Sequence, residues 1–306
     1  MEDPMPRLDP LLNNVLNAAA GLPRNEAQTL AAHALGVSRT WVMAHGDEVL
    51  TEAQALAIQA LCARRLAGEP MAYIFDVREF YGRDFCVSPA TLIPRPETEL
   101  LVSTALSLLK QKHKPAGDVV RVLDLGTGSG AIAISIALES ALEVARDEPT
   151  LSIFATDFSQ AALEVAKNNA QRLGAKVEFA QGDWFAALEK FGIFSPHRDI
   201  KFDAIVSNPP YIAADDTHLG QGDLRFEPRA ALCDEADGLA CYRTIVSQAP
   251  LWLKAGGFLL VEHGWTQSDA VCELFAAAGF KDITVLRDFP APDSPLGTAR
   301  AVLGFV

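Results

Sequence analysis

The order of apolar and polar positions divides the chain into an N-terminal helical part and a longer part in which strands and helices alternate. Residues up to about 70 are rich in Ala and Leu, with Gly36 after one apolar stretch and Thr51 before another. Glycine commonly follows the last turn of a helix, and threonine commonly precedes the first. The pattern therefore predicts that residues 1–70 form a small helical domain.

A short segment of different character follows this block. Residues 71–93 are rich in aromatic and β-branched side chains, with Gly82 between two such runs, which favours a β-hairpin. Residues 71–95 are therefore predicted to be a hairpin linker. The sequence LIPRPETE (92–99) comes next, and its prolines favour extended backbone before a helix resumes after Pro96.

From residue 119, apolar runs of strand length alternate with helix-like segments. Strands are predicted at 119–125, 151–157, 176–183, 202–208 and 258–263, and helices at 131–138, 160–173, 240–253 and 268–278. This alternation is typical of a doubly wound, mostly parallel, Rossmann-like sheet. The last apolar runs, 282–288 and 299–306, predict an antiparallel pair. Residues 96–306 are thus expected to form one α/β domain.

Composition narrows the class of protein. The 306 residues carry a net charge of −13, and such an acidic chain is poorly suited to binding nucleic acid directly. The five cysteines include no Cys-x-x-Cys pair, so neither a disulfide framework nor a metal site is expected. The opening does not resemble a signal peptide, and no apolar run is long enough to span a membrane. We therefore expect a cytoplasmic protein.

The first candidate site is a glycine-rich turn directly after the strand 119–125. Its residues are Gly126, Thr127, Gly128, Ser129 and Gly130. Glycines at such a turn let the backbone approach a ligand without a Cβ atom in the way. The spacing also satisfies the dinucleotide fingerprint G-x-G-x-x-A. A nicotinamide cofactor and an adenosyl ligand both remain open on this evidence alone.

Acidic residues follow the next two strands. Asp157 ends the strand 151–157, where a carboxylate can accept both hydroxyl hydrogens of a ribose, although it could instead cap the following helix. Asp183 and Trp184 follow the strand 176–183. The carboxylate could accept from the amine of an adenine and the indole could pack on its ring, but a tryptophan after a strand often simply fills core.

The fourth candidate site distinguishes between these ligands. Asn208, Pro209, Pro210 and Tyr211 follow the strand 202–208. Two prolines stiffen the chain and remove two backbone donors. The Asn208 side-chain oxygen and the Pro209 carbonyl could then accept both hydrogens of a planar NH₂ group, with Tyr211 covering its face. A dehydrogenase has no use for such a clamp.

Together these motifs resemble S-adenosylmethionine-dependent methyltransferases, and Asn-Pro-Pro-Tyr resembles those that act on planar nitrogens. The flanking sequences GEPMAYIFDVREFYG (68–82), LIPRPETELLV (92–102), HLGQGDLRFEPRAAL (218–232) and GGFLLVEHGWTQ (256–267) are similar to the PrmC/HemK family. Those enzymes methylate the glutamine of the Gly-Gly-Gln motif in class-1 peptide chain release factors. The resemblance covers nearly the whole chain.

The resemblance implies roles for the candidate residues. Residues 126–130 would wrap the methionine and ribose of S-adenosyl-L-methionine, Asp157 would bind the ribose hydroxyls, and Asp183 and Trp184 would lie by the adenine. Asn208 would lie between cofactor and substrate, and residues 208–211 would hold the glutamine amide. The release factor would be the partner. Because a Gly-Gly-Gln loop offers little contact area of its own, we also predict that the helical domain binds the body of the release factor.

Some features are not decided by these motifs. Arg95, Glu97 and Glu99 could contact a ligand or simply begin a helix, and Arg225 and Arg229 could contact a partner or solvent. The stretches 139–150, 191–199 and 290–299 are longer than the family pattern suggests. His218 and His263 are interpreted as structural. The alternatives are an N6-adenine DNA methyltransferase, a nicotinamide-dependent oxidoreductase and a non-catalytic binding module.

Overall fold

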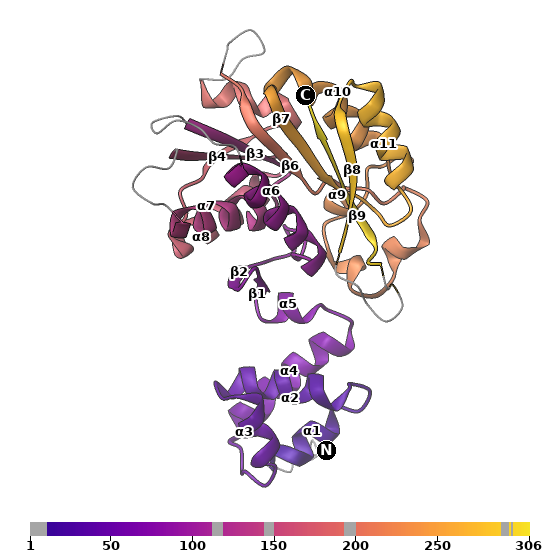
Figure 1. Cartoon of the computed structure of the whole chain (residues 1–306). Helices are drawn as coiled ribbons and strands as arrows, with labels where there is room; N and C mark the ends of the chain where they lie inside the picture. Colours follow the sequence, from indigo (N-terminus) through magenta and orange to yellow (C-terminus); the bar gives the residue numbers. More distant parts are fainter. Residues whose placement is uncertain (1–10, 112–118, 144–149, 193–199, 289–293, 295) are drawn as a thin grey trace. The chain divides into compact units, whose positions relative to one another are not determined.

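The computed structural model describes residues 11–111, 119–143, 150–192, 200–288, 294 and 296–306. Much of the long stretches 139–150, 191–199 and 290–299 lies outside the described residues. The chain divides into two compact units, Met1–Asp76 and Val77–Val306 (Figure 1). No helix among the described residues is long and apolar enough to cross a membrane.

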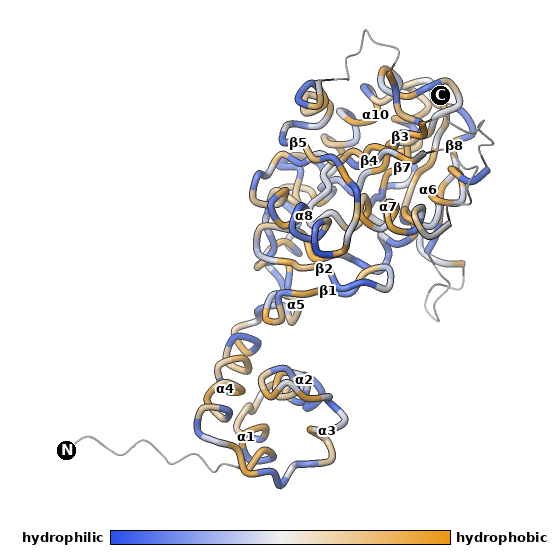
Figure 2. The backbone as a smooth tube through the Cα atoms, turned by 90° about the vertical axis from the view of Figure 1, so that its left-hand side faces the viewer, coloured by the Kyte–Doolittle hydropathy of each residue, from blue (hydrophilic) through white to orange (hydrophobic). Residues whose placement is uncertain are grey.

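The first unit is a small bundle of helices. Its helices are α1 (Leu12–Ala18), α2 (Arg24–Leu35), α3 (Arg39–Ala44), α4 (Glu52–Leu66) and α5 (Met71–Ile74). Hydrophobic and hydrophilic residues alternate along α2 and α4 (Figure 2), and the apolar ones pack into a core of their own. Thr51 forms a capping box with Gln54 at the start of α4, and Gly36 ends α2 in the left-handed conformation. The predicted helical character is confirmed.

Residues 71–74 differ from the prediction of strand. They form α5, because Pro70 precedes its first turn and the Pro70 carbonyl accepts from the backbone N–H of Ile74. The aromatic and β-branched side chains that suggested a strand are instead buried, as at Tyr73 and Ile74. Local backbone bonding therefore overrides side-chain propensity at this position.

The predicted hairpin begins the second unit. β1 (Val77–Phe80) and β2 (Arg83–Cys86) pair antiparallel. Tyr81 and Gly82 connect them with φ angles of 51° and 73°, as a tight two-residue hairpin turn requires. Phe80 and Phe85 are buried in the main core of this unit.

The second unit is built on a seven-stranded sheet in the order β5-β4-β3-β6-β7-β9-β8. The strands are β3 (Val119–Leu125), β4 (Thr150–Asp157), β5 (Glu178–Gln181), β6 (Phe202–Ser207), β7 (Leu253–Glu262), β8 (Lys281–Arg287) and β9 (Ala299–Phe305). β3 to β7 run parallel, and β9 lies antiparallel between β7 and β8. The doubly wound, mostly parallel, Rossmann-like fold is confirmed, including the late antiparallel pair.

Alternate residues of each central strand enter different cores. In β3, Val122 packs into one cluster with α6 (Glu99–Gln111), α7 (Ala131–Glu143) and α8 (Gln160–Leu173), whereas Leu123 packs into a second cluster with α10 (Ala240–Trp252) and α11 (Ser268–Ala277). Helices thus cover both faces of the sheet (Figure 1), as the continuous apolar runs of a parallel sheet require.

One strand begins earlier than its apolar run suggests. β7 starts at Leu253, which pairs with Phe202, and it continues through Gly256 and Gly257 into the predicted strand 258–263. The backbone N–H of Gly256 donates to the carbonyl of Val306. Pairing with neighbours on both sides therefore extends the strand across residues with weak strand propensity.

The remaining short elements connect these strands and helices. They are η1 (Pro96–Thr98), η2 (Trp184–Phe191), η3 (Thr217–Gly220), η4 (Gly222–Phe226) and α9 (Arg229–Leu232). η1 leads directly into α6, and η3, η4 and α9 lie in the long connection between β6 and α10. Both connections contribute to the candidate site.

Candidate functional site

A cavity of about 380 Å³ lies in the second unit, a size typical of small-molecule sites. Its walls include residues that directly follow the carboxyl ends of β3, β4, β5 and β6. β4 and β6 lie on opposite sides of β3, so the cavity occupies the position where ligands bind in open parallel sheets. The segment 90–98 and residues 228–235 complete its walls.

The glycine-rich turn forms one wall of this cavity. Gly126, Thr127, Gly128 and Ser129 line it. The backbone N–H groups of Gly126 and Thr127 both donate to the carbonyl of Thr156, each over 2.9 Å. Gly126 has a φ of +72°, and a Cβ atom there would lie 3.6 Å from the Trp184 ring. The turn is therefore held by hydrogen bonds to β4, and it presents its backbone, with little side-chain bulk, to the cavity.

Gly130 has a different role in the turn, since it is not among the cavity-lining residues. It has a φ of +85°, and a Cβ atom would lie 2.6 Å from the Ile134 side chain and 3.2 Å from that of Ala166. Gly130 therefore allows close packing between the turn, α7 and α8.

Asp157 lies in the cavity wall and holds the glycine turn. Its Oδ2 accepts from the backbone N–H of Gly128 and its Oδ1 from that of Ser159, both over 2.8 Å. Ser159 itself caps α8 by accepting from Ala162, so Asp157 is not the helix cap. Burial raises the pKa of Asp157, and the two backbone hydrogen bonds oppose this rise. Each oxygen retains a lone pair for a ligand hydroxyl.

Asp183 and Trp184 also line the cavity. Trp184 has a φ of +41°, which is rare for a bulky residue, and it packs partly against the core. Phe158 is a further aromatic residue in the wall and is 74% exposed. Sequence reasoning missed Phe158, although its position directly after Asp157 is a usable signal.

Asn208 lines the cavity beside Pro210. The Asn208 Nδ2 donates to the Thr98 hydroxyl over 3.1 Å, and that hydroxyl donates to Oε2 of Glu262 over 2.7 Å. Among the described residues, none donates to the Asn208 side-chain oxygen or to the Pro209 carbonyl. Two acceptors of the predicted clamp are thus available, although Pro209 itself is buried and is not among the lining residues.

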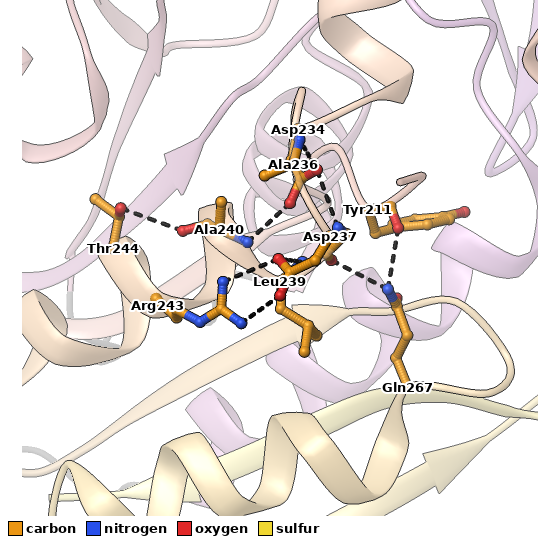
Figure 3. Close-up of polar contacts among 10 residues, drawn as sticks. Tyr211, Asp234, Ala236, Asp237, Leu239, Ala240, Arg243, Thr244 and Gln267 are labelled. Carbon is orange, nitrogen blue, oxygen red and sulfur yellow. Dashed lines mark hydrogen bonds and ion pairs between the residues drawn. The ribbon is translucent and has the colours of Figure 1, made fainter. Parts of the chain in front are cut away.

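Tyr211 is held by its backbone. Gln267 Nε2 donates to the carbonyls of Tyr211 and Gly238, each over 3.0 Å, while Gln267 Oε1 accepts from the N–H of Gly264 (Figure 3). Burial raises the pKa of the Tyr211 hydroxyl above its usual range. The residue is not among those that line the cavity.

The loop that Gln267 contacts is organised by one carboxylate. Asp234 accepts from the backbone N–H groups of Ala236, Gly238 and Ala240 over 2.8–3.0 Å (Figure 3). Asp234 also lines the cavity, as do Cys233 and Cys241. All five cysteines of the chain are free thiols. Asp234 thus fixes the cavity wall contributed by the segment between β6 and α10.

Two buried carboxyl groups lie beside the site. Burial raises the pKa of Asp124, at the end of β3, to about 7, although the Thr127 hydroxyl donates to it over 2.6 Å. Burial likewise raises the pKa of Glu262 to about 7, against the hydrogen bond from Thr98. Perturbed groups of this kind concentrate at functional sites. Sequence reasoning did not identify Glu262 or Gln267 as site residues, because Glu262 ends an ordinary apolar strand and Gln267 lies in the turn after it.

The acidic and basic residues of the segment 92–99 make internal contacts. Arg95 forms an ion pair with Glu227, whose side chain is fully buried and also accepts from the N–H of Ile93. Glu97 lies 3.6 Å from Arg300, and Glu99 accepts from the N–H of Tyr81. Arg95 alone of these three acidic and basic residues is among the cavity-lining residues.

The two arginines after the Asn-Pro-Pro-Tyr motif also have intramolecular partners. Arg229 pairs with Glu235 over 2.7 Å, and Arg225 lies over the Phe226 ring. The described residues include no group of three or more His, Cys, Asp or Glu side chains that could hold a metal ion. Arg229 and Glu235 therefore form an ion pair within the connection between β6 and α10.

Comparison with known proteins places the chain in a family. Residues 13–75 match the family model of the PrmC N-terminal domain, and residues 117–301 match a methyltransferase domain. The release factor glutamine methyltransferase of Bordetella pertussis is 51% identical over 278 residues, covering 91% of this chain and 95% of the relative. That of Escherichia coli is 43% identical, covering 89% and 90%.

A solved structure is also similar. The release-factor-specific protein-(glutamine-N5) methyltransferase of Alicyclobacillus acidocaldarius is 30% identical and covers 72% of this chain and 98% of its own, with a TM-score of 0.41. The identity and coverage of the curated relatives are decisive: the chain belongs to the family of release factor glutamine methyltransferases, in agreement with the PrmC/HemK resemblance of its motifs.

Proposed function

We propose that this enzyme transfers a methyl group from S-adenosyl-L-methionine to the side-chain amide nitrogen of the glutamine in the Gly-Gly-Gln motif of class-1 peptide chain release factors. One observation carries the proposal. The Asn208 side-chain oxygen lies beside a cavity whose other wall is the glycine turn and Asp157, and neither this oxygen nor the neighbouring Pro209 carbonyl accepts a hydrogen bond from the described residues. The names of the curated relatives support the same reaction.

The residues present fit the cofactor. The turn 126–129 exposes backbone without side-chain bulk, and the Asp157 carboxylate can accept from ribose hydroxyls. Trp184 and Phe158 offer ring faces for an adenine, and Asp183 offers an acceptor for its amine. When bound, S-adenosyl-L-methionine supplies an electrophilic methyl group on a positively charged sulfur.

The substrate nitrogen is a poor nucleophile, because the lone pair of an amide is delocalised into its carbonyl group. In our proposal, the Asn208 side-chain oxygen and the Pro209 carbonyl accept hydrogen bonds from the two N–H groups of the substrate amide. These bonds orient its nitrogen toward the cofactor cavity. As the new N–C bond formed and the S–C bond of the methyl donor broke, positive charge would develop on the nitrogen, and the two oxygens would stabilise it. Alignment alone can contribute about 7–11 kcal/mol in such reactions. The sulfur would leave as a neutral thioether, and one N–H proton, made acidic by the charge on nitrogen, would pass to water.

The histidines have no part in this scheme. His263 is buried, with Nδ1 hydrogen-bonded to the carbonyl of Gly264, and burial lowers its pKa. His218 is exposed and pairs with Asp216. Tyr211 contributes through its backbone position, and we propose that its ring borders the bound glutamine.

The test combines one substrate with one variant. The protein is incubated with labelled S-adenosyl-L-methionine and a purified release factor, and the label is mapped by mass spectrometry. We expect label on the glutamine of Gly-Gly-Gln, and we expect Asn208→Ala to lower turnover by about 10²-fold or more. Near-normal turnover of that variant would contradict the clamp.

Two controls address the other hypotheses. Double-stranded DNA replaces the release factor to test the adenine methyltransferase, which the net charge of −13 disfavours. A fluorescence titration with NADH tests the nicotinamide enzyme, which membership of a methyltransferase family disfavours. Label in the DNA or saturable NADH binding would count against the proposal.

A further inference from the structure

The proposed clamp requires that the Asn208 amide be turned one way. An asparagine side chain presents an acceptor oxygen on one side and a donor NH₂ on the other, and the two differ by a half rotation. If the amide were reversed, Nδ2 would face the substrate NH₂ group, and two donors would oppose each other. A device that selects one orientation would therefore control catalysis.

The hydrogen bonds around Asn208 select an orientation. The Thr98 hydroxyl has one proton, and in the ionised form of Glu262 the Oε2 atom, 2.7 Å away, receives it. Thr98 can then only accept from Asn208, so the group that faces it over 3.1 Å must be Nδ2. The reversed amide would place two acceptor oxygens opposite each other, with no proton between them. The Asn208 oxygen consequently faces away from Thr98.

The fold brings these three residues together from distant parts of the sequence. β6 and β7 are parallel neighbours in which Ser207 pairs with Val261, so Asn208 and Glu262 occupy adjacent positions just beyond that pair. Thr98 ends η1, in the segment that precedes α6. The Tyr242 hydroxyl donates to the Glu262 carbonyl over 2.9 Å and fixes its backbone.

The burial of the Glu262 carboxyl group suggests that this group has a functional role. Glu262 is 3% exposed and Thr98 is 4% exposed. A buried carboxyl group is costly unless it is well hydrogen-bonded, and an apolar residue in this position would be easier to accommodate. The charged groups that act on Glu262 are Glu97 and Arg300, of opposite sign. Arg300 instead pairs with Glu97 and Asp288, and the Thr98 hydroxyl donates to the Glu262 carboxyl.

We propose that Thr98 and Glu262 are positioning residues that orient the Asn208 amide, with its oxygen toward the substrate. This inference rests on the proposed function, because it assigns a purpose to the same clamp. The two residues touch neither reacting atom in this scheme. They act through Asn208 alone, and that restriction makes the inference testable.

The first experiment removes the hydroxyl of Thr98 and keeps the shape of its side chain. Thr98→Val in the full-length protein should lower kcat for release factor methylation by about 10- to 100-fold, as misplaced catalytic groups do. The affinity for S-adenosyl-L-methionine, measured by calorimetry, should change less than about twofold, because cofactor binding is expected to be independent of the Asn208 orientation. Thr98→Ser should restore kcat. A loss of cofactor affinity with unchanged kcat would overturn the proposal.

A matched control comes from the same chain. Thr244 lies on α10, and its hydroxyl donates only to the carbonyl of Ala240 within that helix. Thr244→Val should leave kcat unchanged. An equal loss of kcat in this variant would attribute the Thr98→Val effect to general destabilisation and would overturn the proposal.

A double-mutant cycle separates orientation from structural support. In an Asn208→Ala background there is no amide to orient, so adding Thr98→Val or Glu262→Gln should cause no further loss in single-turnover rate. Additive losses would overturn the inference. If Asn208→Ala alone leaves methylation intact, the clamp itself is wrong and the proposed function fails. If Asn208→Ala lowers methylation but Thr98→Val methylates at the normal rate, only the inference about Thr98 and Glu262 is overturned, and the proposed function stands.

Discussion

The side-chain amide of Gln267 donates a hydrogen bond over 3.0 Å to the backbone carbonyl of Tyr211, the last residue of the Asn-Pro-Pro-Tyr motif. The same nitrogen donates to Gly238, and the amide oxygen accepts from Gly264. One side chain therefore joins the motif to the loop before α10 (Figure 3) and to the turn after β7. Prolines leave the motif with few backbone donors of its own, so an outside donor has to fix its end.

We expect Gln267→Glu to lower methylation. A carboxylate has no N–H to donate, and it would face the carbonyls of Tyr211 and Gly238 as a third acceptor. Unpaired buried acceptors cost about 1–3 kcal/mol, and displacement of the motif by ~1 Å can reduce the rate by about 10²-fold. Steady-state kinetics with a release factor measures kcat. Arg243→Gln, which breaks the exposed pair between Arg243 on α10 and Asp237 in the loop before that helix, is the control and should keep full activity.

Asp157→Asn should weaken cofactor binding more than turnover. The two carboxylate oxygens accept from Gly128 and Ser159, and an asparagine would turn an NH₂ group toward one of these donors. A hydrogen bond to a charged group is worth about 1.5–3 kcal/mol, so the affinity for S-adenosyl-L-methionine should fall by at least about tenfold. Isothermal calorimetry measures it. Unchanged affinity would show that Asp157 serves only the turn.

Stability should depend on pH through Glu262. Burial raises the pKa of this carboxyl from 4.5 to about 7, so the folded protein binds its proton more tightly than the unfolded chain does. The contribution to stability is complete below pH 4.5 and is lost as the pH rises through about 7. Asp124, whose pKa is also raised to about 7, acts in the same direction.

Glu262→Gln isolates this contribution because glutamine is uncharged at every pH. Each unit of pKa difference corresponds to about 1.4 kcal/mol. Between pH 5 and pH 8, the free energy of unfolding of the unaltered protein should therefore fall by up to about 3 kcal/mol relative to that of the variant. Urea unfolding at the two pH values gives the difference. A difference that does not change with pH would mean that Glu262 keeps an ordinary pKa in the folded protein.

The parts of the fold that could be predicted are those in which one local pattern is sufficient. The strand 119–125 and the helix 160–173 appear with the predicted bounds. The strand is a mostly apolar run, and the helix lies between the N-cap Ser159 and the C-cap Gly174. Residues 71–74 and the start of β7 differ because backbone bonding to Pro70 and to neighbouring strands overrides side-chain preference. These contacts have no signature in the local sequence.

The candidate site divides in the same way. Gly126 and Asn208 follow strands in recognisable motifs, Asp157 ends a strand, and all three line one cavity. The residues that hold them do not belong to those motifs. Thr98 lies 110 residues before Asn208, and Gln267 contacts Tyr211 from 56 residues away. Only the sheet order, with β7 beside β6, brings Glu262 to the site, and a single sequence does not specify that order.

The first unit should contribute to recognition of the whole release factor. A Gly-Gly-Gln loop is small, whereas specific protein interfaces bury about 1,200–2,000 Å² in total, so further surface is needed. Met43 and Val49 of this unit are 60% and 66% exposed, and exposed apolar side chains are frequent at interaction surfaces. We expect Met43→Ser combined with Val49→Ser to lower kcat/KM on the intact release factor by about tenfold, the equivalent of 1.4 kcal/mol.

A short Gly-Gly-Gln peptide separates docking from catalysis, because under the proposed function it would need only the clamp at residues 208–211. The double variant should methylate this peptide at the normal rate. Leu251→Ser is the matched control, since Leu251 is 56% exposed but lies on α10 of the second unit, and it should change neither activity. Equal losses on peptide and intact protein would assign the first unit to stability of the enzyme. Unchanged kcat/KM on both substrates would exclude these two side chains from the interface.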